Sequence, residues 1–244
     1  MATEEKLSSD ERKALLREFS RGAKLIFSNA EQLFQEAQAL RKNGSFARSL
    51  FLHQISMEEC AKVEMIGAWA TTVLMGKGID LEVMASGFRS HKAKNHTNAY
   101  MARVTEEELE ARKRGDWKES AAAFDRFKAR FHQELNTAKN VSLYVDFKDA
   151  KFSAPPSEVV TEDLLKEFWS LNQYFLQVTF PYLRLLERIE DDDGPLHRVV
   201  TLFTDKTEDI WQRMQDDPNS AMGAVLDEML KLDKAERRDT DSSK

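Results

Sequence analysis

An uninterrupted helical pattern of apolar residues near the N-terminus constrains this chain more than any other feature. Between residues 15 and 40, apolar side chains recur every three or four positions, which places them on one face of a single long helix. Asn43-Gly44 then supplies a helix stop, and Ser45 can cap a second helix that runs to about residue 76. A connection this short makes the two long helices antiparallel neighbours.

The rest of the chain also favours helices. With 9 glycines and 5 prolines, the 244 residues have too few turn formers for a β-rich fold. We therefore predict an all-α, multi-helix bundle. Further helices are expected over residues 79–87, 88–103, 105–140 and 162–190, with a break at 114–116 in the third and a kink at Pro181 in the last.

Two segments interrupt the helical pattern. Residues 143–147 are expected to be extended and to pack into a groove between helices, and Pro155-Pro156 indicates a loop after them. A linker at residues 191–195 divides the chain into a bundle of residues 1–190 and a C-terminal appendage of residues 191–244. The appendage should contain two shorter helices and a frayed polar tail.

Composition narrows the class of protein further. The longest apolar run falls far short of the roughly 20 residues that span a bilayer, and the N-terminus lacks a secretory pattern. We therefore expect a cytoplasmic protein that does not associate with membranes.

The single cysteine, Cys60, excludes an internal disulfide and a cysteine-based zinc site, and is expected in the core. Residues 190–244 carry 8 basic and 15 acidic residues, so the net charge of −6 comes from this C-terminal part of the chain. The rest of the chain is not acidic overall and could therefore bind an anionic partner.

Charged residues lie unexpectedly within the apolar stripe of the second helix. At 100° per residue, Glu58 and Lys62 fall inside the stripe and Glu59 on its flank. Burying an unpaired ion costs several kcal/mol, and the spacing of four residues allows Glu58 and Lys62 to pair. They could form a structural ion pair that sets the helix register, or a polar cluster that faces groups on another helix.

A basic stretch follows at residues 88–103, which contain no acidic residue. Its cations and histidines could track a phosphate backbone, or could simply form a solvated face. If the stretch is one helix, a single face carries Arg89, Lys92, His96 and Tyr100. The chain has no Glu-x-x-His pattern for a di-iron bundle, no glycine-rich phosphate loop and no serine elbow. We expect neither a metal nor a cofactor.

Three motifs, in this order, resemble those of the AbiV-type abortive-infection proteins. The first is the helix of residues 47–62, with its Glu-Glu-x-x-Lys ending; the second is His91-Lys92-Ala93-Lys94; the third is Leu143-Tyr-Val-Asp-Phe147 followed by Pro155-Pro156. The resemblance implies membership of the HEPN group of all-α bundles. Many of that group are toxins or phage-defence effectors, and many are metal-independent ribonucleases whose active sites form between two protomers. A homodimer is implied in the same way.

Such ribonucleases carry an Arg followed four to six residues later by a His. The His acts as general base or acid at the ribose 2′-hydroxyl, and the Arg stabilises the charged transition state. The chain offers three loose matches: Arg48…His53, Arg126…His132 and Arg89…His96. On a straight helix the first two pairs are about 140° and 120° apart, whereas the third returns to the same face about 10 Å along the axis.

These observations predict a composite site. We expect Glu58, Glu59 and Lys62 to meet His91, Lys92 or Lys94 across a helix interface, with Tyr144 and Asp146 closing the site. His91 or His96 would carry the proton in the reaction. Glu58 would orient that imidazole or tune its pKa. Phosphate would be held by Arg89, Lys92, Lys94 and Arg103.

The leading hypothesis is a phage-defence effector that arrests growth by acting on RNA or the translation machinery. A metal-independent endoribonuclease activity is one way in which it could do so. The alternative is a non-catalytic helical module that is activated by a phage-encoded or host protein. A nucleotide-binding HEPN bundle would need the same basic pocket, and the sequence does not separate it from the first hypothesis.

Overall fold

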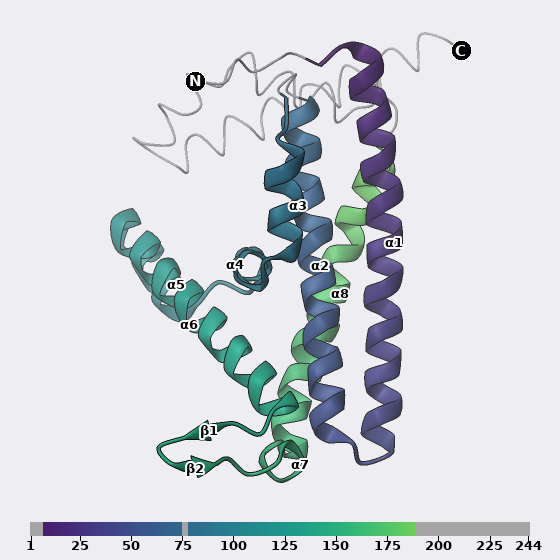
Figure 1. Cartoon of the computed structure of the whole chain (residues 1–244). Helices are drawn as coiled ribbons and strands as arrows, with labels where there is room; N and C mark the ends of the chain where they lie inside the picture. Colours follow the sequence, from purple (N-terminus) through teal and green to yellow (C-terminus); the bar gives the residue numbers. More distant parts are fainter. Residues whose placement is uncertain (1–6, 75–77, 189–244) are drawn as a thin grey trace, which may run out of the picture.

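The described part of the chain folds into a helical bundle with one small β-hairpin (Figure 1). The structure is a computed structural model and describes residues 7–74 and 78–188. Its elements are α1 (Ser9–Lys42), α2 (Phe46–Leu74), α3 (Leu81–Arg89), α4 (His91–Met101), α5 (Glu106–Lys113), α6 (Trp117–Leu143), β1 (Phe147–Lys148), β2 (Lys151–Phe152), α7 (Pro156–Val159) and α8 (Glu162–Arg188). The predicted all-α class is confirmed. The predicted appendage lies outside the described residues.

The two long N-terminal helices form the predicted antiparallel pair. Ser8 and Glu11 make a reciprocal capping box at the start of α1. Asn43 ends the helix, and Gly44 adopts a φ of 73°, the left-handed conformation that a residue with a side chain rarely takes. α2 then runs back along α1 over nearly its whole length.

α2 is the central helix of the bundle. α1 and α8 flank it, and α4 and α6 cross it on a further side (Figure 1). It therefore buries polar as well as apolar residues, and no single apolar stripe describes it. Its apolar side chains enter three core clusters, and Cys60 is fully buried in one of them with Met57 and Phe175.

Buried hydrogen bonds also fasten α2 to its neighbours. Ser56 Oγ donates to the Ala30 carbonyl at 2.7 Å and lies 3.1 Å from Asn172 Oδ1. The Asn172 amide lies 3.0 Å from His53 Nδ1. These bonds satisfy polar groups that burial would otherwise leave unpaired at a cost of about 1–3 kcal/mol each.

The basic stretch of residues 88–103 is not one helix, contrary to prediction. Ser90 ends α3 and begins α4, and its hydroxyl accepts a hydrogen bond from the Ala93 amide at 3.1 Å. Serine is among the best N-cap residues, so it competes with helix continuation at this point. α3 packs against α2 through Phe88, whose ring lies 5.5 Å from that of Trp69.

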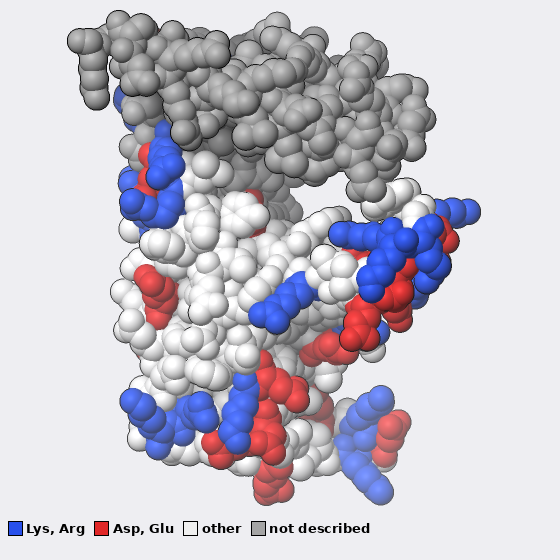
Figure 2. Space-filling model, turned by 180° about the vertical axis from the view of Figure 1, so that it is seen from behind, with Lys and Arg blue, Asp and Glu red and all other residues white. Residues whose placement is uncertain are grey.

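α5 and the first part of α6 stand away from the bundle (Figure 1). The predicted break between them is confirmed: Gly115 has a φ of 71°, and Asp116 caps α6 by accepting from the Glu119 amide. Seen from behind, this arm carries a dense mixture of basic and acidic side chains, while the middle of the adjoining face is largely uncharged (Figure 2).

The segment after α6 is extended, as predicted, but it does not pack between helices. It leads into the β1–β2 hairpin, where Asp149 and Ala150 both take positive φ values of 51° and 60°. This tight turn pairs Phe147 with Phe152, ring to ring at 4.8 Å, and leaves them 64% and 75% exposed. The apolar rings therefore contact one another instead of a groove.

α8 extends through Pro181 within one helix. No helix in residues 7–74 or 78–188 is both long enough and apolar enough to cross a bilayer.

Candidate functional site

α4 is the element that gathers the chemically active side chains. It lies between α2 and α6 and packs on both. His91, Lys94 and Asn98 reach α2, while Asn95 and His96 reach α6. The candidate site therefore has two parts, one on each side of the helix.

Glu58 is the centre of the part that faces α2. Its side chain is 3% exposed, and the Lys94 ammonium donates to Oε2 at 2.6 Å. His91 Nδ1 lies 2.7 Å from both carboxylate oxygens. Asn98 adds a 3.0 Å hydrogen bond to the Met57 carbonyl. The carboxylate of α2 thus binds two side chains of α4 and fixes the position of that helix.

This arrangement corrects two predictions. Lys62 does not pair with Glu58; it pairs with Glu59 three residues earlier, and its ammonium lies 5.9 Å from the centre of the Phe88 ring. Lys94 from α4 takes the place at Glu58 instead. Because Lys94 is only 6% exposed and already paired, it does not present its charge to a phosphate in solution.

His91 differs from its partners because its side chain is half exposed. The carboxylate engages Nδ1, which leaves Nε2 as the ring nitrogen for a substrate or solvent. A buried carboxylate bound to one ring nitrogen orients the imidazole, as in many acid–base sites.

The second part of the site is a histidine pair between α4 and α6. The His96 and His132 rings meet edge to face, with centroids 5.6 Å apart, and Asn95 Nδ2 lies 3.2 Å from His132 Nδ1. Burial lowers the pKa of His96, and the neighbouring His132, Lys92 and Lys128 lower it further. His96 is therefore neutral at neutral pH and can accept a proton.

His132 joins the site although the sequence pointed to it only through the loose match Arg126…His132. The sequence feature that could have identified His132 is the series Phe124, Lys128 and His132, spaced four residues apart on one face of α6. Lys92, His96 and Tyr100 have the same spacing on α4. The match itself does not hold, because Arg126 is exposed and pairs with Glu119 and Glu107 on the arm.

The other two Arg/His matches are also excluded by the fold. His53 is fully buried, and burial together with Arg41 lowers its pKa to about 4. Arg89 belongs to α3, so the helix break at Ser90 separates it from the face of α4 that carries His96.

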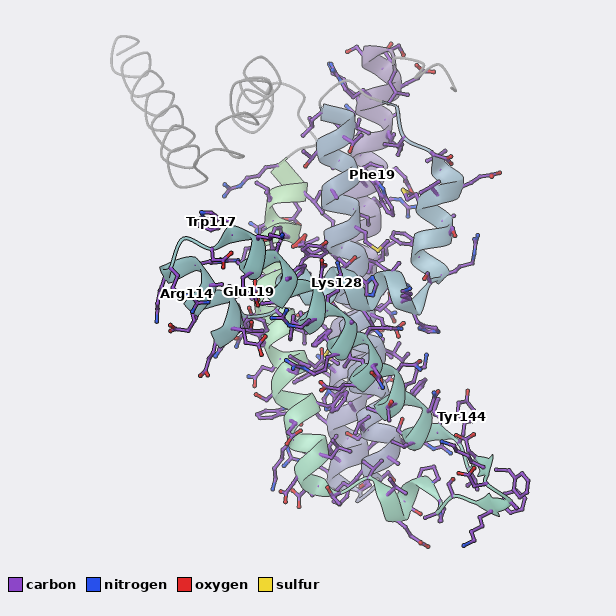
Figure 3. All side chains as sticks on the ribbon, turned by 90° about the vertical axis from the view of Figure 1, so that its left-hand side faces the viewer. Phe19, Arg114, Trp117, Glu119, Lys128 and Tyr144 are labelled. Carbon is purple, nitrogen blue, oxygen red and sulfur yellow. The ribbon has the colours of Figure 1, made fainter. Side chains whose placement is uncertain are left out.

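The remaining predicted residues lie apart from both clusters. Arg103 is exposed just beyond α4, where its guanidinium stacks over the Tyr174 ring at 5.2 Å. Tyr144 and Asp146 do not close the site. Tyr144 follows His132 by twelve residues, or about 18 Å of helix, and is labelled at the far end of α6 in Figure 3. Across the described part of the chain, no three His, Cys, Asp or Glu side chains are grouped to hold a metal ion.

Comparison with known proteins finds a family model and a bacterial relative that are similar to this chain. The family model HEPN_AbiV, described as AbiV, matches residues 18–177, more than half of the chain and all of α4 and α6. Over 122 residues the chain is 36% identical to a protein of Sinorhizobium fredii (strain NBRC 101917 / NGR234) described as uncharacterized protein y4gJ. That match covers 49% of this chain and 63% of the relative, so it spans less than two thirds of the relative's length. No solved structure matches the chain.

Proposed function

Because this chain belongs to the AbiV family of HEPN proteins, we propose that it is an abortive-infection effector that cleaves RNA at the α4–α6 face. The observation that carries the proposal is the His96–His132 pair, with two lysines close enough to shift the His96 pKa. Two imidazoles can act as general base and general acid in phosphodiester cleavage, and two cations can stabilise the charge that develops on the phosphoryl group. The reaction would take place in the cytoplasm of the infected cell.

The chemistry assigns one role to each imidazole. Neutral His96 accepts the proton of a ribose 2′-hydroxyl, and the 2′-oxygen attacks the adjacent phosphorus. The bond from phosphorus to the 5′-oxygen breaks, and His132 donates a proton to that oxygen. The products are a 2′,3′-cyclic phosphate and a free 5′-hydroxyl. Lys92 and Lys128 stabilise the negative charge that develops on the phosphoryl oxygens.

The Glu58 cluster supports this site in the proposal. By holding Lys94 and His91, Glu58 sets the position of α4 on α2, and so the distance from His96 to His132. His91, oriented by the carboxylate and half exposed, is the second candidate for a proton carrier.

Cleavage of total bacterial RNA in the presence of EDTA tests the proposal. Wild-type protein should generate cyclic-phosphate ends, and His96→Gln and His132→Gln should each reduce the rate at least about 100-fold, the typical contribution of acid–base catalysis. Lys166→Ala, which removes an exposed cation on α8, is the matched control and should cut normally.

Circular dichroism must first show that all variants are folded. Unchanged cleavage by both histidine variants would refute the assignment of His96 and His132. Loss of cleavage in His91→Asn alone would instead identify His91, which is bound to Glu58, as the proton carrier. If the folded wild type leaves RNA intact, the ribonuclease proposal fails.

A second function, a binding module activated by a phage or host protein, is favoured by the hairpin. Tyr144, Val145, Phe147 and Phe152 are all more than half exposed there, as expected of a contact surface for another protein. Phage-infection assays separate the two functions. A module should lose protection with Phe147→Ser and keep it with His96→Gln, whereas a ribonuclease should lose it with His96→Gln.

A further inference from the structure

We propose that the ring pair Tyr100–Phe124 is a base-stacking subsite that restricts the substrate to unpaired RNA. The inference rests on the proposed function, since it names the kind of RNA that the histidine pair would receive. Neither ring belongs to the composite site or to the apolar core, although the sequence placed Tyr100 on the basic face of residues 88–103.

The subsite and the histidine pair lie along the same line of contact between α4 and α6. Tyr100 follows His96 by one helical turn on α4, and Phe124 precedes Lys128 and His132 by one and two turns on α6. The rings of Tyr100 and Phe124 lie 4.8 Å apart, and those of His96 and His132 lie 5.6 Å apart. The two helices therefore place the aromatic pair about 6 Å from the imidazole pair along α4 and about 12 Å from it along α6.

Lys128 connects the two pairs. Its ammonium lies 5.7 Å from the Tyr100 ring centre and 5.4 Å from that of Phe124, and it is near enough to His96 to lower its pKa. Lys128 also pairs with the exposed Asp125 at 2.8 Å. Figure 3 shows Lys128 in the middle of α6, between the arm and the C-terminal end of the helix.

The ring of Tyr100 is accessible to a ligand from solvent. The side chain is 68% exposed, while Phe124 lies partly buried beside it. An exposed ring that rests on a second ring and has a cation beside it offers a flat surface for a planar heterocycle and a charge for the phosphate attached to it.

The substrate class follows from this geometry. Bases in a duplex are covered on both faces by their neighbours, whereas unpaired bases of loops and single strands can stack on an aromatic side chain. With a base on Tyr100, Lys128 lies beside it, and the histidine pair lies within about two nucleotides of it. The geometry thus favours cleavage next to an unpaired nucleotide.

Binding of a 2′-O-methyl RNA oligonucleotide tests the subsite independently of cleavage, because its blocked 2′-oxygen cannot attack phosphorus. Fluorescence polarisation should show that wild-type protein binds the single strand more tightly than the same sequence in a duplex. Tyr100→Ala should weaken single-strand binding roughly 5- to 100-fold, the typical loss for one stacked base. Tyr100→Phe, which keeps the ring, should bind like the wild type.

Tyr182→Ala is the matched control, because Tyr182 is also exposed but belongs to α8. Equal binding by Tyr100→Ala and wild type, equal affinity for single strand and duplex, or no binding by wild type would each overturn the subsite. Tyr100-dependent binding by a wild type that does not cleave ordinary RNA would support the subsite and refute the ribonuclease. Cleavage that depends on His96 but not on Tyr100, together with unchanged binding by Tyr100→Ala, would refute the subsite alone.

Discussion

Replacing Glu58 by glutamine tests whether this carboxylate fastens α4 to α2. The native carboxylate is 3% exposed and neutralises Lys94, whose side chain is 7% exposed. Glutamine keeps the shape but removes the negative charge, so that Lys94 becomes a buried cation without compensation. Breaking a buried ion pair in this way costs about 3–5 kcal/mol. That is a large share of the ~5–15 kcal/mol by which folded domains are usually stable.

Urea denaturation followed by circular dichroism measures this loss in unfolding free energy. The double variant Glu58→Gln/Lys94→Met removes both charges and should recover most of the stability, since an apolar side chain replaces the buried cation. Lys166→Met, at an exposed ion pair of α8, should leave the transition unchanged. A loss below about 1 kcal/mol for Glu58→Gln, typical of exposed pairs, would refute the reasoning, as would a double variant no more stable than the single one.

Two further measurements test buried groups of α2. Because burial and Arg41 lower the pKa of His53 to about 4, His53 takes up a proton on unfolding below its ordinary pKa of about 6.5. Its contribution to stability is complete above about pH 6.5 and is lost, by up to about 3 kcal/mol, as the pH falls towards 4. His53→Gln should flatten the dependence of unfolding free energy on pH in that window, and an unchanged slope would contradict the assignment. Burial raises the pKa of the Cys60 thiol to about 12, so a thiol reagent should label it only in denaturant; rapid labelling of the native protein would contradict its burial.

The two parts of the site have separable roles in these experiments. Glu58 variants act on the position of α4, and should change stability and cleavage together. His96, His132 and Tyr100 are only partly buried or exposed, so their variants should change cleavage or RNA binding while the protein stays folded. Measuring both stability and cleavage for each variant therefore distinguishes residues that hold the site in place from residues that act on the RNA.

Local signals in the sequence determined where most helices begin and end. Asn43-Gly44 and Gly115-Asp116 act on the backbone within a few residues, through positive φ angles and side-chain caps, and both boundaries were predicted correctly. The Ser90 cap was missed because the residues around it also suit a continuous helix.

The sequence also identified Glu58 as anomalous, since its place in an apolar stripe required a partner. It did not identify which partner, because Lys62 was available within the same helix and Lys94 only through a contact between α2 and α4. The outcome depended on which ammonium the packing brings to the buried carboxylate.

Only the tertiary structure paired His96 with His132 and Tyr100 with Phe124, and only it exposed the hairpin rings that had been expected in a groove. These contacts join residues more than twenty positions apart, or depend on the direction in which a segment leaves its helix. Helical periodicity describes the faces of one element, whereas the crossing of two elements decides which faces meet. The sequence by itself therefore determined the helices and the charged residue that needs a partner, and the packing of α4 against α2 and α6 decided the composition of the site.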